Sequence, residues 1–179
     1  EDASLNYAKL SYEEGNPYEN VADVLHFFLK TYPKSPSYEE INGLMVTSYL
    51  YQQNYQGALD FLSKNRTKQN EDLIKEVSYY RGIQLFNTSN MPKALPYFEL
   101  GKYAVESSIK ALSFYWCAET NYRLGNYQKS IDDFINFKKI ASKESEEFQL
   151  VDYNLGYGYF KLKQYSTSAK VFQDFINTK

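Results

Sequence analysis

A repeat of about 36 residues constrains this chain more than any other feature of its sequence. Its anchors, at spacings of 37, 36, 36 and 38 residues, are Tyr18, Tyr55, Met91, Tyr127 and Tyr165. Three residues after each anchor lies a mostly small residue: Val21, Ala58, Ala94, Ser130 or Ser168. Four residues further on, a large apolar residue follows: Leu25, Leu62, Phe98, Phe134 or Phe172. A period of this length indicates stacked copies of one supersecondary unit that together bury a continuous core.

The last unit shows most clearly what each copy is. Between residues 149 and 172, the side chains of Leu155, Tyr159 and Leu162 fall on one face of a helix. Gly156 and Ser168 remove bulk at the point where a second helix would cross the first. The pattern therefore predicts a helical hairpin in which an aromatic ring from the second helix fills the space left by the small residues.

These positions resemble the tetratricopeptide (TPR) family, a 34-residue helix-turn-helix repeat. Leu155-Gly156 and Tyr159 match its L-G-x₂-Y motif, and Tyr165 and Phe172 match its aromatic positions. The resemblance implies an all-α, right-handed α-solenoid of about five repeats forming a single domain over residues 1–179. The expected repeats cover about residues 1–36, 37–70, 72–108, 109–145 and 146–179.

Helix ends can be predicted from capping residues. In the first two units we expect helices at residues 6–14, 18–32, 37–53 and 55–64, with a capping box formed by Ser37 and Glu40. The repeated residues Asn54, Asn90 and Asn126 each precede a second helix, where an N-cap side chain is worth about 1 kcal/mol. Gly125 is expected to end a helix, and Pro96 to introduce a mild kink.

The sequence offers little for catalysis, metal binding or nucleic-acid binding. His26 is the single histidine and Cys117 the single cysteine, so no His/Cys zinc set can form. A net charge of −2 gives no electrostatic case for nucleic acid. No apolar run approaches the roughly 18 residues of a transmembrane helix. We therefore expect a non-enzymatic protein without cofactor, metal site or transmembrane segment.

The binding surface is predicted from the resemblance, because positions 2, 5, 9, 12 and 13 of the first TPR helix face the inner groove. These positions hold Tyr79, Phe86, Tyr115, Glu119, Tyr122, Arg123, Tyr153, Tyr157, Phe160 and Lys161. Tyrosine and arginine are enriched among binding hot spots, so a concave, tyrosine-rich groove favours a protein or peptide partner. Positions 5 and 12 can equally be half buried against the neighbouring unit. The alternative function is a glycan-binding module with exposed aromatic platforms, although Trp116 is the single tryptophan.

A second resemblance is to large multi-repeat TPR proteins of Bacteroidetes-type bacteria. It rests on the segments at residues 12–21, 80–87, 118–127 and 153–165, which read YEEGNPYENV, YRGIQLFN, AETNYRLGNY and YNLGYGYFKLKQY. It implies an exported protein several times this length, periplasmic or associated with the outer membrane, with a cytoplasmic location left open. The final predicted helix, residues 165–178, carries Val171, Phe172, Phe175 and Ile176. We expect a further repeat or a second copy to cover this helix, because exposed apolar patches mark contacts.

Overall fold

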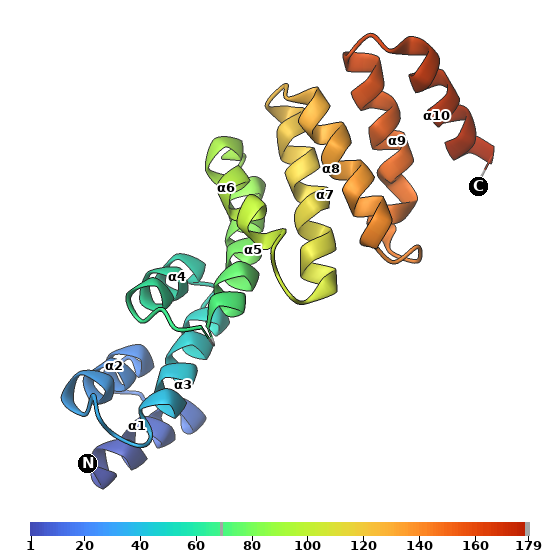
Figure 1. Ribbon diagram of the computed structural model, residues 1–179. Helices are drawn as coiled ribbons and strands as arrows, with labels where there is room; N and C mark the ends of the chain where they lie inside the picture. Colours follow the sequence, from blue (N-terminus) through green and yellow to red (C-terminus); the bar gives the residue numbers. More distant parts are fainter. Residues whose placement is uncertain (69, 178–179) are drawn as a thin grey trace. The chain divides into compact units, whose positions relative to one another are not determined.

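The computed structural model describes residues 1–68 and 70–177, and this part of the chain folds into ten α-helices with no strand (Figure 1). The chain divides into two compact units, residues 1–66 and residues 67–179. The boundary falls near the end of the second expected repeat, residues 37–70. The all-α class is therefore confirmed, while the expectation of a single domain over the whole chain stays a prediction.

The first unit is built from two helical hairpins. Its helices are α1 (Asp2–Glu14), α2 (Val21–Thr31), α3 (Tyr38–Tyr51) and α4 (Tyr55–Lys64). Each packs against the next, and α1 also contacts α3. Leu25, Phe28 and Ile41 are completely or almost completely buried in the core between the two hairpins. The apolar repeat positions thus lie in the interior, as their period predicts.

The second unit stacks three hairpins. Its helices are α5 (Glu71–Asn87), α6 (Met91–Gly101), α7 (Ser107–Arg123), α8 (Tyr127–Ile140), α9 (Glu146–Lys161) and α10 (Tyr165–Asn177). Consecutive helices pack together throughout, and α5 also contacts α7. Two apolar clusters fill the layers, one centred on Phe98 and the other on Phe134. This repeated arrangement of helix pairs is that of an α-solenoid, as the sequence repeat predicts.

The small residues of the repeat lie where they were expected, at the helix crossings. Ala94 and Ser130 are fully buried. A Cβ atom on Gly156 would lie 2.5 Å from the ring of Phe172, and the Ser168 hydroxyl donates a hydrogen bond to the Gly156 carbonyl at 2.8 Å. Close approach of the two helices therefore depends on these side chains being small.

Several predicted details in the first unit are wrong. Helix α1 begins at Asp2, four residues earlier than expected. Helix α2 begins at Val21 instead of Tyr18, because Asn20 caps it by accepting a hydrogen bond from the Ala22 amide at 2.9 Å. Ser37 makes no side-chain capping hydrogen bond, so the expected capping box is absent.

The repeated asparagines do not share one role. Asn54 caps α4 by accepting a hydrogen bond from the Gly57 amide at 2.9 Å, as predicted. Asn90 and Asn126 occupy the same position but make no side-chain capping bond. Asn126 instead donates to the side chain of Asn121 at 3.3 Å. The same residue at the same repeat position can therefore cap its helix or bond to another side chain, and repeat position alone does not decide between the two.

Candidate functional site

A pocket in the second unit collects residues from three helices, and we call it the Glu119 pocket. It encloses about 240 Å³ and is lined by Glu119 and Tyr122 of α7, Phe134 of α8, and Tyr153, Asn154 and Tyr157 of α9. Helices α7 and α9 are the first helices of successive hairpins. Four of its six lining residues belong to the predicted groove set, which the structure thus brings together in part.

Asn154 organises the polar side of the pocket. Its Nδ2 donates to Glu119 Oε1 at 2.8 Å and to the hydroxyl of Tyr115 at 3.3 Å. These bonds join α9 to α7 and fix the side-chain amide. The Oδ1 atom of Asn154 makes no hydrogen bond to any residue in the described part of the chain. The pocket therefore presents a fixed acceptor beside a carboxylate.

The aromatic side of the pocket is held by ring packing. Tyr153 and Tyr157 meet edge to face, with ring centroids 4.9 Å apart, and the Tyr153 hydroxyl donates to that of Tyr157 at 3.4 Å. Tyr157 also packs edge-on against Phe172 of α10 at 5.2 Å. Both tyrosines keep about two fifths of their area exposed. Phe172 therefore holds the Tyr157 ring in place, while both tyrosines remain partly accessible to solvent.

Electrostatics distinguish Glu119 from the surface acids. Burial raises the pKa of its carboxyl group, and the positive charge of Arg123 opposes this only in part. Glu119 forms no ion pair with any residue in the two described ranges. Burial also raises the pKa of Tyr122. A carboxylate removed from water without a counter-ion is unfavourable and favours binding of a group that compensates it.

Three residues of the predicted groove set lie in the core instead. Tyr79, Phe86 and Tyr115 are each less than a tenth exposed. Tyr79 packs against Phe98, and Tyr115 lies edge-on to Phe134. The rings at positions 5 and 12 of the third unit, and at position 5 of the fourth, thus support the repeat interface and offer no open contact surface.

The remaining predicted residues do not line the pocket. The guanidinium of Arg123 lies over the ring of Phe86, 4.4 Å from its centroid. Lys161 is exposed, and Phe160 is half exposed beside Tyr165. Sequence reasoning missed Asn154 and Phe134. Phe134 was assigned to the core, whereas Asn154 occupies position 6, one residue outside the expected pattern, in an otherwise apolar stretch.

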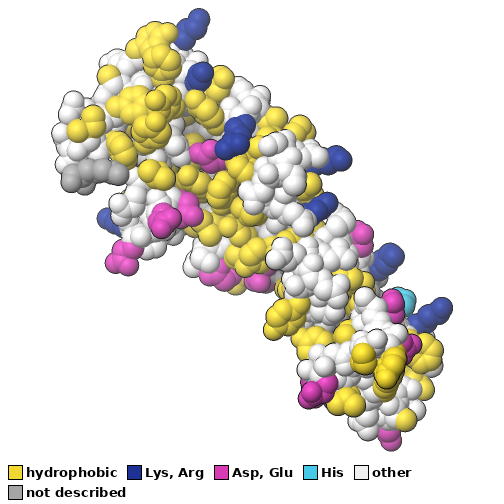
Figure 2. All heavy atoms as spheres, turned by 180° about the vertical axis from the view of Figure 1, so that it is seen from behind, with side chains coloured by type: hydrophobic (Ala, Val, Ile, Leu, Met, Phe, Trp, Pro, Cys, Tyr) yellow, Lys and Arg dark blue, Asp and Glu magenta, His cyan; other side chains and the backbone are white. Residues whose placement is uncertain are grey.

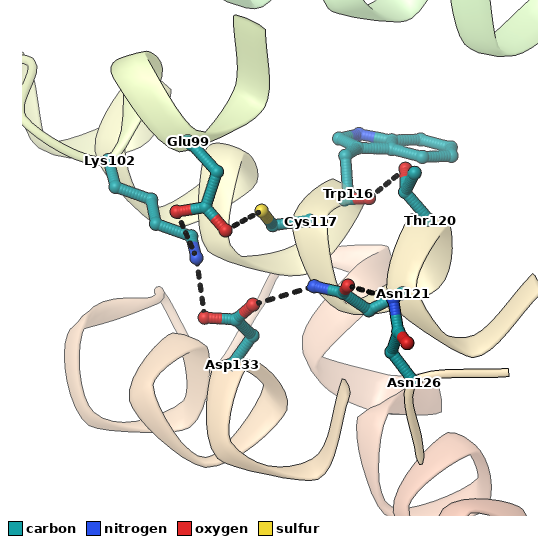
Figure 3. Close-up of polar contacts among 8 residues, drawn as sticks. All are labelled: Glu99, Lys102, Trp116, Cys117, Thr120, Asn121, Asn126 and Asp133. Carbon is teal, nitrogen blue, oxygen red and sulfur yellow. Dashed lines mark hydrogen bonds and ion pairs between the residues drawn. The ribbon is translucent and has the colours of Figure 1, made fainter. Parts of the chain in front are cut away.

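A second polar cluster lies between α6, α7 and α8 (Figure 3). The Lys102 ammonium pairs with Asp133 at 2.7 Å and with Glu99 at 3.0 Å. Cys117 donates to Glu99 at 3.3 Å, and Asn121 donates to Asp133 at 3.4 Å. Burial lowers the pKa of Lys102, but the charge of the ionised Cys117 thiol, the charge and hydrogen bond of Asp133 and the hydrogen bond of Glu99 outweigh this and raise it.

Ligand atoms of Glu99, Cys117 and Asp133 in this cluster lie within 4.8 Å of one another, which is close enough for a shared metal ion. The Lys102 ammonium already supplies the positive charge that these acids require. Burial raises the pKa of the Cys117 thiol, so the thiolate that a metal needs is disfavoured. The donor set fits an internal ion-pair network that fixes three helices, and the residues do not fit a metal.

Apolar side chains also gather on the surface at the C-terminal part of the second unit, as Figure 2 shows. Along α10, exposed residues include Tyr165, Ala169 and Ile176, the last with 65% of its area exposed. Within the described residues, no helix has the length and apolar character needed to cross a membrane.

Comparison with known proteins adds a structural likeness. No family model matches the sequence, and no curated protein matches it significantly. Many solved structures have a similar fold, and among them are two of MamA and one of YrrB. A MamA fragment from Desulfovibrio magneticus RS-1 has 18% identity and a TM-score of 0.55, covering 98% of this chain and 93% of its own.

The other two structures are equally distant in sequence. A further MamA structure has 14% identity and a TM-score of 0.58, over 98% of this chain and 90% of its own. YrrB, described as a TPR protein with an unusual peptide-binding site, has 16% identity and a TM-score of 0.55, over 97% and 84%. Structural similarity at sequence identities of 14–18% shows that the fold is shared. The chain therefore has the fold of a TPR-type α-solenoid built from stacked helical hairpins.

Proposed function

We propose that this chain is a non-enzymatic interaction scaffold that binds a peptide segment of a partner protein in the Glu119 pocket. The observation that carries the proposal is the convergence of Glu119, Tyr122, Tyr153 and Tyr157 from two successive first helices on one open pocket. These residues were selected from repeat position alone. The fold supports the proposal because solenoids offer extended surfaces for partners.

The chemistry of the pocket suits a peptide. The exposed tyrosines offer large, rigid contact area at low cost in conformational entropy. The fixed Asn154 Oδ1 can accept a hydrogen bond from a backbone amide, and Glu119 can accept from a further donor. YrrB, a structural neighbour, is described as having a peptide-binding site. A mixed aromatic and polar surface of this kind is typical of binding hot spots.

A glycan-binding module is the second candidate, because exposed tyrosine rings and amide or carboxylate groups can also contact sugar hydroxyls. Trp116 does not contribute a platform. It is only partly exposed and packs edge-on against Phe86 at 5.0 Å and Tyr115 at 5.4 Å. The aromatic surface available to a sugar is therefore limited to the tyrosines, and peptide binding is the stronger proposal.

Peptide display against the purified chain tests the proposal, with a panel of neutral oligosaccharides as the competing class. For a selected peptide, Tyr122→Ala and Tyr157→Ala should each weaken binding by about 1 kcal/mol or more. Tyr103→Ala, at a tyrosine that is 72% exposed in the α6–α7 loop, is the matched control and should bind normally. Tyr115→Ala should lose stability, because its ring is buried.

The proposal fails if no peptide is selected, if an oligosaccharide binds instead, or if Tyr122→Ala and Tyr157→Ala both bind as tightly as the unmodified chain. Loss of binding strictly in step with loss of stability would also contradict it. Thermal melts of each variant separate these outcomes.

Two further parts of the proposed role concern assembly and location. Exposed Tyr165, Ala169 and Ile176 of α10 correspond by repeat position to Tyr127, Ile131 and Lys138 of α8. Helix α9 packs on α8, and a Cβ on Gly158 would lie 2.8 Å from Ile131. We propose that another helical hairpin, from a second copy of the chain, packs on α10 in the same way. Location in the cell envelope, within a longer protein, is proposed from the motif resemblance.

A further inference from the structure

We infer that the Glu119 pocket recognises a positively charged ammonium group of the bound peptide, either a lysine side chain or a free N-terminus. This inference rests on the proposed peptide-binding function and adds the chemistry that the pocket selects. It follows from the combination of one carboxylate with aromatic side chains in a confined space.

The carboxylate is the first component. Glu119 lies in the pocket wall with one oxygen, Oε1, bonded to Asn154 at 2.8 Å. Its other oxygen makes no hydrogen bond to any described residue. The nearest cation on the same helix, Arg123, is held over the ring of Phe86 and forms no ion pair with Glu119. A ligand cation can therefore take the place of the missing counter-ion.

Aromatic side chains are the second component. Tyr122, Phe134, Tyr153 and Tyr157 contribute four of the six lining residues. Aromatic rings attract a cation through their quadrupole when it lies within about 6 Å of the ring centroid. An ammonium group has three N–H donors, so it can also donate a hydrogen bond to Oδ1 of Asn154. No described lysine or arginine lines the pocket, so it offers nothing to an anionic ligand.

The ionisation of Glu119 gives the inference a distinct pH signature. Burial raises the pKa of this carboxyl group in the free protein, so the neutral form persists to higher pH than for an ordinary glutamate. A cation binds the ionised form, so affinity should rise as pH increases through this pKa. The titratable and charged groups around Glu119 are Arg123, Tyr115, Tyr122, Tyr153 and Tyr157. Burial raises the pKa of Tyr115 and of Tyr122, which moves their ionisation further above this window.

The test uses a peptide selected by display and made in three matched forms. The first peptide carries lysine and an acetylated N-terminus. The second carries norleucine in place of lysine and the same acetylated N-terminus, and the third carries norleucine and a free N-terminus. Affinity is measured by titration calorimetry between pH 4 and pH 8. We expect the norleucine peptide with a blocked N-terminus to bind at least about tenfold more weakly than a form that presents an ammonium group. The third form reveals which source of ammonium the pocket uses.

Glu119→Gln supplies the decisive comparison, because glutamine keeps an acceptor for Asn154 and removes only the charge. In this variant the lysine and norleucine forms should bind alike, and the pH dependence below pH 7 should disappear. Glu119→Asp should restore part of the discrimination. Glu144→Gln, at an exposed acid in the α8–α9 loop, removes the same charge elsewhere and should change nothing.

The outcomes separate this inference from the function on which it rests. If peptides bind in the pocket but neither ammonium source matters, or if discrimination persists in Glu119→Gln, the cation inference is overturned and peptide binding stands. If display yields no peptide whose binding depends on Tyr122 or Tyr157, the proposed function fails and the inference fails with it.

Discussion

Gly82 of α5 lies so close to Phe98 of α6 that a Cβ atom on the glycine would come within 2.6 Å of the phenylalanine ring. The same relationship recurs between Gly156 and Phe172, at 2.5 Å. The third and fifth hairpins thus close on the same contact, an aromatic ring of the second helix against a glycine of the first. This contact explains why, in these two hairpins, a glycine of the first helix occurs together with a phenylalanine at the large position of the second.

Replacing Gly82 with alanine should destabilise the protein, although alanine is the better helix former. The methyl group would force the fully buried Phe98 ring to move, and overpacking costs about 1–3 kcal/mol. Gly43→Ala is the matched control, because no atom lies within 4 Å of a Cβ at that position in α3. There the change should stabilise by up to about 1 kcal/mol. Urea unfolding measures both, and a stabilising Gly82→Ala would contradict the packing.

The core was predictable from the sequence because the same type of residue recurs at each packing position in successive repeats. Leu25, Leu62, Phe98 and Phe134 are all essentially fully buried. The site was harder to predict. Positions 5 and 12 hold tyrosine or phenylalanine both where they are buried, as at Tyr115, and where they are exposed, as at Tyr153. The residue type is the same, and only the packing of a neighbouring hairpin decides between them.

Asn154 is a residue of the site that repeat position did not predict. Its importance comes from bonds to Tyr115 and Glu119, which lie 39 and 35 residues away in the chain. Repeat position did not select it, because it lies between two groove positions. Tertiary hydrogen bonds of polar side chains are the part that periodicity does not encode.

The ion pair between Lys102 and Asp133 should contribute more than a surface pair. Both side chains are only about a tenth exposed, so removing Lys102 leaves the Asp133 carboxylate buried without its cation, whereas removing Asp133 leaves Lys102 paired with Glu99 alone. We expect Lys102→Met to cost about 3 kcal/mol, and Lys102→Met combined with Asp133→Asn to cost less than the two single changes together. Equilibrium unfolding in urea of all four proteins gives the coupling free energy.

The pair between Lys138 and Asp152 is the matched comparison, because about a third of each side chain is exposed. The same substitutions there should give a coupling free energy of about 1 kcal/mol or less. Equal coupling in the two pairs would show that burial does not set the strength of the inner pair.

The exposed apolar face of α10 should promote association between copies of the chain. Ile176→Lys places a charge at the most exposed apolar position of that face and should shift the protein toward the monomer. Thr167→Lys adds the same charge on the opposite, exposed face of α10 and should leave association unchanged. Light scattering over a range of concentrations measures the effect. A monomer at every concentration before any substitution would refute the proposed packing.

Glu119→Gln should make the free protein more stable at neutral pH, even though it impairs the proposed binding. Burial raises the folded-state pKa of Glu119 above its unfolded value, which for a glutamate is about 4.3. The native state therefore holds this proton more tightly than the unfolded state, and the contribution of Glu119 to stability falls as pH rises through the window between the two pKa values. At neutral pH the ionised group is unfavourable in the fold, and glutamine removes that effect.

Urea unfolding at pH 7 should accordingly show a higher midpoint for Glu119→Gln than for the unmodified chain, with the difference vanishing below about pH 4. Glu144→Gln should show no such change. A lower midpoint at pH 7 would mean that the charge-assisted hydrogen bond to Asn154 outweighs the cost of burying the carboxylate, and that Glu119 serves the fold. A higher midpoint together with lost discrimination for lysine peptides would mark Glu119 as a residue retained for binding at the expense of stability.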